Sequence, residues 1–154
     1  MKEFVSWELI DDCVTDIAFH LEDTGKDFKG VFGVPRGGSL LAVMLSHKLD
    51  IPYITDFRKV DLGFTDKGAS SGLWEMGPDG DIVVIDDITD TGKTFQFYKE
   101  QPETKDAHYV TIHEHKQSIV KPDYSVINKG DKWIVYPWET TDSEEIQDYL
   151  KEKK

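Results

Sequence analysis

The amino-acid sequence predicts an α/β protein whose core is a doubly wound, mostly parallel sheet flanked by helices. Short apolar runs alternate with longer segments of helical period, a pattern typical of βαβ units with parallel strands. The run 82–85 is continuous in Val and Ile, as expected of a strand buried on both faces. Together these observations predict one sheet with helices on both of its sides.

The first half of the chain supplies two predicted helices and two predicted strands. The first helix is amphipathic, because its apolar residues recur at spacings of three and four: Trp7, Ile10, Val14, Ile17 and Leu21. Ser6 is its expected N-cap. A short buried strand is expected at 29–35, a helix at 39–49 and a second strand at 51–57.

The second half adds the central strand, a short helix and several later elements. These are a helix at 94–100, a strand at 107–113, a late pair of strands at 124–128 and 132–137, and a final helix up to Lys151. Residues 58–80 hold five glycines and show no clean periodicity. Such a long aperiodic stretch in a small domain is usually a functional loop or disordered, so we expect a flexible lid over a site.

Length and composition fit one domain covering residues 1–154. The net charge of -12 argues against a broad nucleic-acid-binding surface, which would be basic. The sequence predicts neither a membrane span nor a signal peptide. The single cysteine, Cys13, fits a reducing compartment. We therefore expect a cytoplasmic protein without a membrane or nucleic-acid partner.

The stretch 83–95, VVIDDITDTGKTF, carries the strongest functional signal. Its tail is similar to the end of a Walker phosphate loop, but that loop needs a glycine five residues before Gly92, where Asp87 stands. The segment Thr91–Thr94 can instead offer backbone N–H groups and two hydroxyls to a monophosphate. Asp86 and Asp87 precede it, where the vicinal hydroxyls of a sugar would lie.

A second loop, VPRGGSLLA at 34–42, follows the first predicted strand. Ligands of open parallel sheets bind beyond the carboxyl ends of the strands. The loops that follow Val34, Ile85 and Ile112 all have this position. We therefore expect the three loops to converge on one crevice.

The two loops together resemble the signature of type I phosphoribosyltransferases. VVIDDITDTGKT is similar to the family's phosphoribosyl-pyrophosphate motif, which has a hydrophobic strand, two acids and a T-G-x-T tail, and VPRGGSLLA is similar to its pyrophosphate loop. The resemblance implies the type I fold with a small C-terminal hood. It also implies Mg²⁺ near Asp87 and Asp86, held directly or through water. The residues implied to bind phosphoribosyl pyrophosphate are Arg36, Gly37, Asp86, Asp87, Asp90, Thr91, Gly92, Lys93 and Thr94.

The resemblance implies catalytic roles for two of these residues. Arg36 would hold pyrophosphate oxygens bidentately and stabilise the leaving group. Asp90 stands where 6-oxopurine members of the family usually carry Asp, and it would exchange a proton with the second imidazole nitrogen of the purine. Arg58 and Lys59, at the root of the predicted lid, are candidates for further pyrophosphate contacts.

The segment 121–139 resembles the base-binding hood of microbial xanthine-guanine and hypoxanthine enzymes. The resemblance implies that the Trp133 ring stacks on the base. It further implies that main-chain groups around Ile134 and Val135 read the edge of the base.

One position departs from the family pattern. Family members carry a lysine that donates to the 6-oxo group, and His115 stands at that position here, with Lys116 beside it. Either side chain could supply the donor. His113 and His115 alternate along one strand face, but a metal site is the weaker interpretation because no third ligand is within reach by sequence.

The resemblance implies a purine salvage enzyme that transfers phosphoribosyl from phosphoribosyl pyrophosphate to guanine, xanthine or hypoxanthine. It also implies a homo-oligomer, a dimer or tetramer. One alternative is a phosphoribosyltransferase for another base, which Asp90 and Trp133 disfavour. Another is a non-enzymatic nucleotide-sensing regulator on the same fold, which the acidity of the chain and its full set of site residues disfavour.

Overall fold

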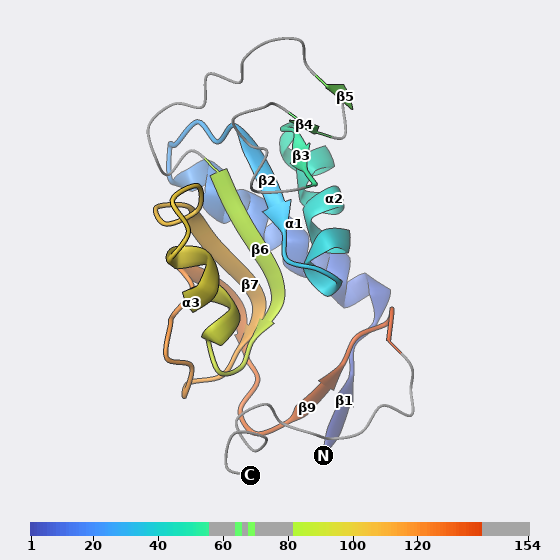
Figure 1. Cartoon of the computed structure of the whole chain (residues 1–154). Helices are drawn as coiled ribbons and strands as arrows, with labels where there is room; N and C mark the ends of the chain where they lie inside the picture. Colours follow the sequence, from blue (N-terminus) through green and yellow to red (C-terminus); the bar gives the residue numbers. More distant parts are fainter. Residues whose placement is uncertain (56–63, 66–67, 70–81, 140–154) are drawn as a thin grey trace.

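The computed structural model describes residues 1–55, 64–65, 68–69 and 82–139 (Figure 1). The predicted lid at 58–80 lies outside the described residues, apart from two short strands within it. Arg58, Lys59 and the predicted final helix also lie outside them.

The strands form one seven-stranded sheet and one two-stranded sheet. Their bounds are Lys2–Phe4 (β1), Gly30–Gly33 (β2), Tyr53–Ile54 (β3), Phe64–Thr65 (β4), Gly68–Ala69 (β5), Ile82–Thr89 (β6), His108–Glu114 (β7), Tyr124–Asn128 (β8) and Trp133–Val135 (β9). The order in the larger sheet is β5-β4-β3-β2-β6-β7-β8. All its pairings are parallel except those of β4 with β3 and β5. The predicted mostly parallel α/β sheet is confirmed.

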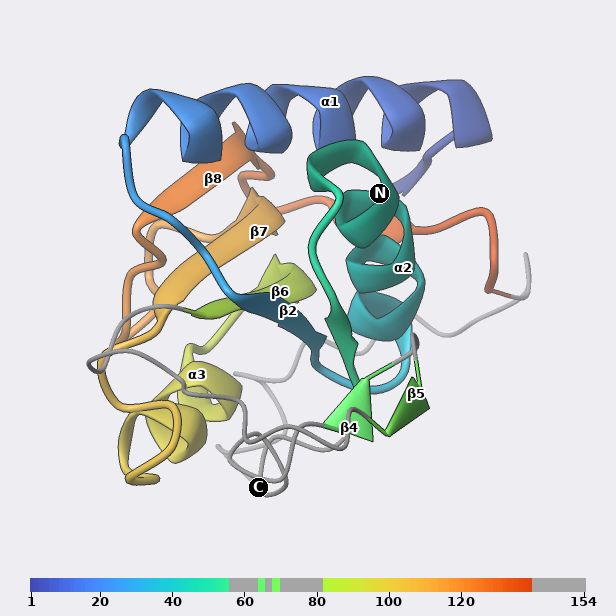
Figure 2. The same ribbon diagram turned by 90° about the horizontal axis from the view of Figure 1, so that it is seen from above.

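Helices cover both faces of this sheet, as Figure 2 shows. α1 (Trp7–Asp23) and α2 (Gly37–Leu49) pack on one face, and α3 (Lys93–Lys99) packs on the other. The side chains of β6 alternate between the two cores. Val83 and Ile85 belong to the core under α1 and α2, whereas Ile82 and Val84 belong to the core under α3. This alternation explains why the run is apolar without a break.

The central strand is longer than the sequence predicts. We expected it to end at Ile85, but β6 continues to Thr89 because its parallel pairing with β7 continues, with Asp86 opposite Thr111 and Ile88 opposite His113. The two acids therefore lie within the strand instead of in a loop after it. Backbone pairing with a buried neighbour fixes their position more firmly than a loop would.

The predicted late pair of strands is wrong in its pairing. β8 is an edge strand of the main sheet, parallel to β7, whereas β9 pairs in parallel with β1, a three-residue strand that we did not predict. The Trp133 N–H donates to the Met1 carbonyl at 2.9 Å, and the Val5 N–H donates to the Val135 carbonyl at 2.9 Å. The N-terminus of the chain therefore supports the hood.

The first helix begins as predicted, with the Ser6 hydroxyl accepting the Leu9 N–H at 3.0 Å. Its apolar stripe is buried except for Trp7, which is 55% exposed and whose ring centre lies 5.9 Å from that of Trp138. Among the described residues, no helix is long and apolar enough to cross a membrane.

Candidate active site

A cavity of about 770 Å³ lies at the carboxyl ends of β2 and β6. Eight of the nine residues predicted to bind phosphoribosyl pyrophosphate line it, and Lys93 is the exception. The other lining residues include Thr89, Phe95, Trp138 and Glu139. The loop after β7, the third of the loops expected to converge, contributes no described residue to the lining.

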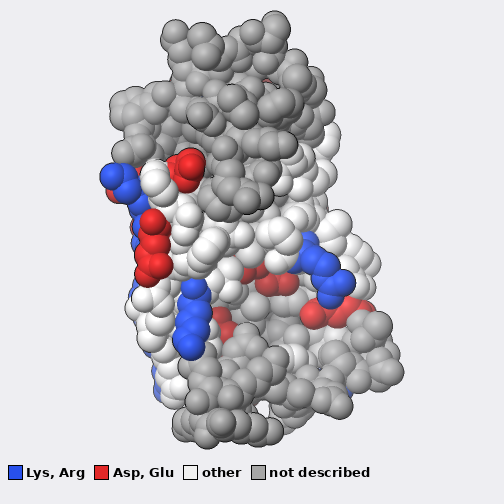
Figure 3. Space-filling model, in the orientation of Figure 1, with Lys and Arg blue, Asp and Glu red and all other residues white. Residues whose placement is uncertain are grey.

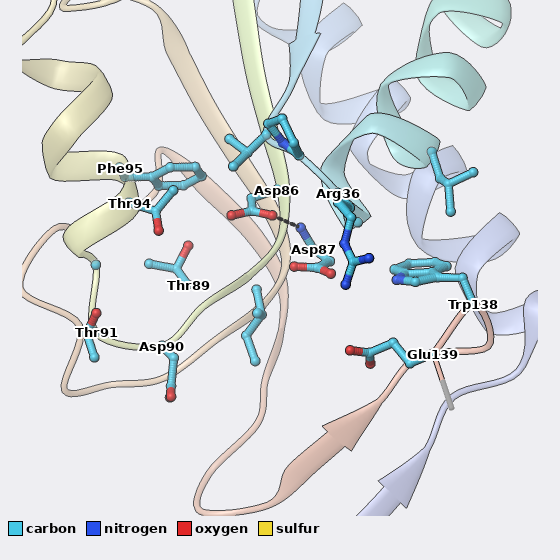
Figure 4. A pocket seen from close by; sticks show the side chains of 16 residues that line it. Arg36, Asp86, Asp87, Thr89, Asp90, Thr91, Thr94, Phe95, Trp138 and Glu139 are labelled. Carbon is cyan, nitrogen blue, oxygen red and sulfur yellow. Dashed lines mark hydrogen bonds between the residues drawn. The ribbon is translucent and has the colours of Figure 1, made fainter. Parts of the chain in front are cut away.

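The lining residues follow an order along the cavity, which Figure 4 shows. The Arg36 guanidinium points in at one end, near Trp138, and Thr91 and Thr94 lie at the other. Asp86 and Asp87 lie between these ends. Figure 3 shows acidic side chains at the floor of a hollow on this face, with basic side chains beside it.

The loop after β2 can approach β6 because it carries glycine. Arg36 is the N-cap residue of α2, and the Pro35–Arg36 peptide is cis. A Cβ on Gly37 would collide with the Asp87 carboxylate. The absence of a side chain at Gly37 therefore allows the loop that carries Arg36 to lie against the acidic strand.

Asp86 and Asp87 form a coupled acidic pair. The Asp87 N–H donates to Asp86 Oδ1 at 2.8 Å. Burial raises the pKa of Asp86 well above its ordinary range, and the charge of Asp87 adds to that rise. Burial also raises the pKa of Asp87, to about 6, and the nearby Glu139 carboxylate adds to it. Desolvated neighbouring carboxylates of this kind favour a cation or hydroxyl donors beside them.

Tyr136 joins the hood to this pair, a role that we did not predict. Its side chain is buried, and its O–H donates to the Asp87 carbonyl at 2.9 Å. Since that donation uses the only hydroxyl proton, the 2.8 Å contact with His113 has the imidazole Nδ1–H donating to the Tyr136 oxygen. Burial lowers the pKa of His113 to about 4, so the ring is neutral at pH 7. The Tyr136 N–H donates to Glu139 Oε1 at 2.8 Å.

The predicted phosphate-binding loop, Thr91–Thr94, packs against the segment that follows β7. Gly92 has a φ of 88°, and a Cβ there would lie 2.6 Å from the Ser118 Oγ and 2.6 Å from the Val120 nitrogen. The Ile119 N–H donates to the Thr91 carbonyl at 2.8 Å. The Lys93 N–H donates to the Thr91 hydroxyl oxygen at 3.2 Å. Gly92 is therefore required both by its conformation and by this close packing.

The structure does not bring the two candidate base donors to the cavity. His115 is fully buried, its Nδ1 accepts the Gln117 N–H at 3.0 Å, and its Nε2 lies 3.4 Å from Asp131 Oδ1. Lys116 is exposed, and its carbonyl accepts the Lys121 ammonium at 2.6 Å. Neither residue lines the cavity. Within the described ranges, no three His, Cys, Asp or Glu side chains converge as a metal cluster.

The remaining predicted base contacts, Trp133, Ile134 and Val135, are not among the residues that line the cavity. Trp133 is partly buried, and within the described chain its Nε1 has no hydrogen-bond partner. The main-chain groups of Trp133 and Val135 point to β1. Successive residues of a strand direct their main-chain N–H and C=O groups to opposite sides of the strand, so those of Ile134 point away from β1.

The sequence also did not predict that a buried lysine, Lys129, lies beside Asp90. Lys129 is 3% exposed, and its Nζ lies 3.3 Å from Asp90 Oδ1. Its ammonium donates to the Lys132 carbonyl at 3.0 Å, and its main-chain N–H donates to the Glu114 carbonyl at 3.0 Å. A lysine in the turn sequence NKGDK is typical of a solvated loop, so no local signal indicated its burial.

Comparison with known proteins defines the family. The family model described as "Phosphoribosyl transferase domain" matches residues 2–145. The chain is 30% identical over 141 residues to a xanthine-guanine phosphoribosyltransferase of Desulfotalea psychrophila, covering 88% of this chain and 85% of that protein. It is 28% identical over 142 residues to the enzyme of the same name from Idiomarina loihiensis, with 88% and 86% covered.

Solved structures show the same architecture. A purine phosphoribosyltransferase from Pyrococcus horikoshii matches with a TM-score of 0.66 and 29% identity, covering 94% of this chain and 99% of that one. A Helicobacter pylori xanthine-guanine-hypoxanthine phosphoribosyltransferase shares the fold, with a TM-score of 0.64 at 16% identity and 99% and 98% covered. This chain therefore belongs to the phosphoribosyltransferase family of enzymes. Its fold is the type I fold of that family.

Proposed function

We propose that the chain transfers phosphoribosyl from phosphoribosyl pyrophosphate to a 6-oxopurine, namely guanine, xanthine or hypoxanthine, and releases pyrophosphate. The order of groups along the cavity carries this proposal. Arg36, the Asp86–Asp87 pair and the Thr91–Thr94 loop follow one another as a pyrophosphate, a ribose and a 5-phosphate do in that substrate. The names of the curated relatives support a purine as the acceptor.

Three protein features would hold the sugar phosphate. The Arg36 guanidinium would bind pyrophosphate oxygens and stabilise the charge that they gain as the bond to C1′ breaks. The Thr91 and Thr94 hydroxyls, with backbone N–H groups of their loop, would bind the 5-phosphate. Asp86 and Asp87 would accept hydrogen bonds from the ribose hydroxyls.

The acidic pair also fits Mg²⁺. Its carboxylates are adjacent and desolvated, and burial raises the pKa of both, so a divalent cation would relieve their repulsion. Mg²⁺ is usually held by one or two carboxylates together with substrate phosphates and waters, and Asp86 and Asp87 would supply the carboxylates. When bound, the ion would neutralise charge on the pyrophosphate.

Asp90 would act on the base. As the purine nitrogen bonds to C1′, a proton on the other imidazole nitrogen becomes acidic and would pass to the Asp90 carboxylate. Asp90 lines the same cavity, between the acidic pair and the Thr91–Thr94 loop, and a base bound over the ribose would bring its imidazole edge to this carboxylate. Trp133 and the main chain of Ile134 would contact the remainder of the base.

Pyrophosphate release, measured with phosphoribosyl pyrophosphate, Mg²⁺ and each free base in turn, tests the proposal. We expect release with at least one of guanine, xanthine and hypoxanthine and not with adenine or uracil. Release only with adenine or a pyrimidine would overturn the base class. Nucleotide binding without turnover of any base would instead favour the regulator alternative.

A further inference from the structure

Thr89 is a buried polar residue of the cavity to which the sequence assigned no role. It is the last residue of β6, and it is only 4% exposed although it lines the cavity. Its backbone is fixed, because it pairs with Glu114 of β7 and its carbonyl accepts the His115 N–H at 2.8 Å. The sheet, and not a loose loop, therefore sets the position of this side chain.

The Thr89 hydroxyl has no hydrogen-bond partner within the described part of the chain. An enclosed hydroxyl without a partner costs stability, and valine fills nearly the same volume without that cost. The Thr111 hydroxyl shares this lack of a partner in the described chain, but Thr111 is fully buried and does not line the cavity. The missing partner together with the place of Thr89 at the cavity therefore points to a ligand.

Thr89 lies at the end of the cavity that holds Thr91 and Thr94. Figure 4 shows the hydroxyl oxygens of Thr89 and Thr94 directed toward one another. The Thr91 hydroxyl accepts the Lys93 N–H at 3.2 Å, which leaves its own proton to donate. Three threonine hydroxyls thus gather at the place that the proposed function gives to the 5-phosphate. A phosphate monoester offers three acceptor oxygens, so it can accept from each of them.

We propose that the Thr89 hydroxyl donates a hydrogen bond to the 5-phosphate of phosphoribosyl pyrophosphate, as a third hydroxyl beside those of Thr91 and Thr94. The proposal rests on the proposed function, since it takes this end of the cavity as the 5-phosphate site. It adds a residue of the strand to the loop residues that the family resemblance implies. In the free protein the oxygen is enclosed, and rotation about the Cα–Cβ bond turns it to the ligand without movement of the strand.

Two ligands separate the 5-phosphate from the rest of the cavity. Phosphoribosyl pyrophosphate carries that phosphate, whereas inorganic pyrophosphate would occupy only the Arg36 end. Thr89→Val keeps the shape of the side chain and removes its hydroxyl. In calorimetric titrations with Mg²⁺, this variant should bind phosphoribosyl pyrophosphate about 10- to 100-fold more weakly, the loss expected for one hydrogen bond to a charged group. It should bind inorganic pyrophosphate as the wild type does.

Thr111→Val is the matched control, because it also removes a buried hydroxyl without a partner in the described chain. It should bind both ligands as the wild type does. Neither variant should unfold at a lower urea concentration than the wild type, since each loses an unsatisfied polar atom. Unchanged affinity of Thr89→Val for phosphoribosyl pyrophosphate, or an equal loss for the two ligands, would overturn the proposal. A lower urea midpoint for Thr89→Val alone would also contradict it, because the hydroxyl would then have a partner in the free protein.

Thr89→Ser and Thr89→Ala decide the question if Thr89→Val does not fold, because these two side chains differ by one oxygen. The serine variant should keep its affinity for phosphoribosyl pyrophosphate within about threefold of the wild type, and the alanine variant should lose about tenfold or more. Equal affinities of the two variants would reject the role of the hydroxyl.

The wild-type protein distinguishes this inference from the proposed function. Wild-type protein that binds neither ligand and releases no pyrophosphate with any 6-oxopurine contradicts the proposed function itself. Wild-type protein that binds phosphoribosyl pyrophosphate, while Thr89→Val binds it equally well, contradicts only the assignment of Thr89.

Discussion

Removal of the Tyr136 hydroxyl tests most sharply the hydrogen bond that joins the hood (residues 121–139) to strand β6 of the main sheet. Tyr136→Phe keeps the ring, which stacks on Trp138 with ring centres 4.8 Å apart and planes 2° apart. It removes only the oxygen that donates to the Asp87 carbonyl and accepts from His113. The substitution is therefore close to a pure hydrogen-bond deletion.

The magnitude follows from the two groups left behind. The Tyr136 side chain is buried, so water does not replace its oxygen readily. A buried donor or acceptor left unsatisfied costs about 1–3 kcal/mol, and here one carbonyl and one imidazole N–H lose a partner. We expect Tyr136→Phe to lower the free energy of unfolding by about 2–4 kcal/mol. Phosphoribosyl pyrophosphate should also bind more weakly, because Asp87 loses a support.

Urea unfolding at equilibrium measures the first effect, with Tyr124→Phe as the control. The Tyr124 hydroxyl donates to Asp16 at the surface, where water can take its place, so its loss should change stability by less than about 0.5 kcal/mol. Equal effects of the two substitutions, or a loss below about 0.5 kcal/mol for Tyr136→Phe, would refute the reasoning.

Three further substitutions probe separate parts of the site. Asp90→Asn keeps the shape of the side chain but removes its ability to exchange a proton. Turnover should therefore fall by about 10²–10⁴-fold, while the affinity for phosphoribosyl pyrophosphate changes little. Steady-state rates within about threefold of wild type would contradict the role of Asp90 as an acid–base residue. Asp87→Asn should raise the unfolding free energy of metal-free protein by about 1–3 kcal/mol at about pH 8, because the pKa of Asp87 is raised to about 6 and the carboxyl is stabilising only while protonated. That gain, followed by urea unfolding, should vanish as the pH falls to about 4, and a pH-independent gain would count against a desolvated carboxylate. Trp133→Ala should weaken base binding in calorimetry by roughly 1–3 kcal/mol, and unchanged affinity would remove the ring from the base site.

The parts of the fold that the sequence predicted well are those with a local physical signal. The apolar residues of α1 recur at helical spacing, and β6 begins with an unbroken apolar run, so in both elements the pattern alone indicates which residues are buried. The meeting of the Arg36 loop with the Thr91–Thr94 loop followed from the rule that parallel strands present their carboxyl ends at one edge. Neither inference needed a long-range contact to be known.

The missed features all depend on contacts between distant segments. β1 has only three residues, and its pairing with β9 spans almost the whole described chain. The burial of Lys129 follows from the β7–β8 pairing, which places a turn lysine beside Asp90. His115 was predicted to contact the base because it stands at the position of the family's lysine. Its ring nitrogens lie instead at Gln117 and Asp131, and the sequence does not show these contacts.

Calorimetric titration of phosphoribosyl pyrophosphate into the base-free protein tests the central claim most directly, since the claim is that one cavity holds that molecule. The account predicts that one molecule binds per chain and that binding requires Mg²⁺. Arg36→Met removes the charge of a side chain that lines the cavity, so binding should weaken strongly in that variant. Binding that is absent in the wild type, or that is indifferent both to excess chelator and to Arg36→Met, would contradict it.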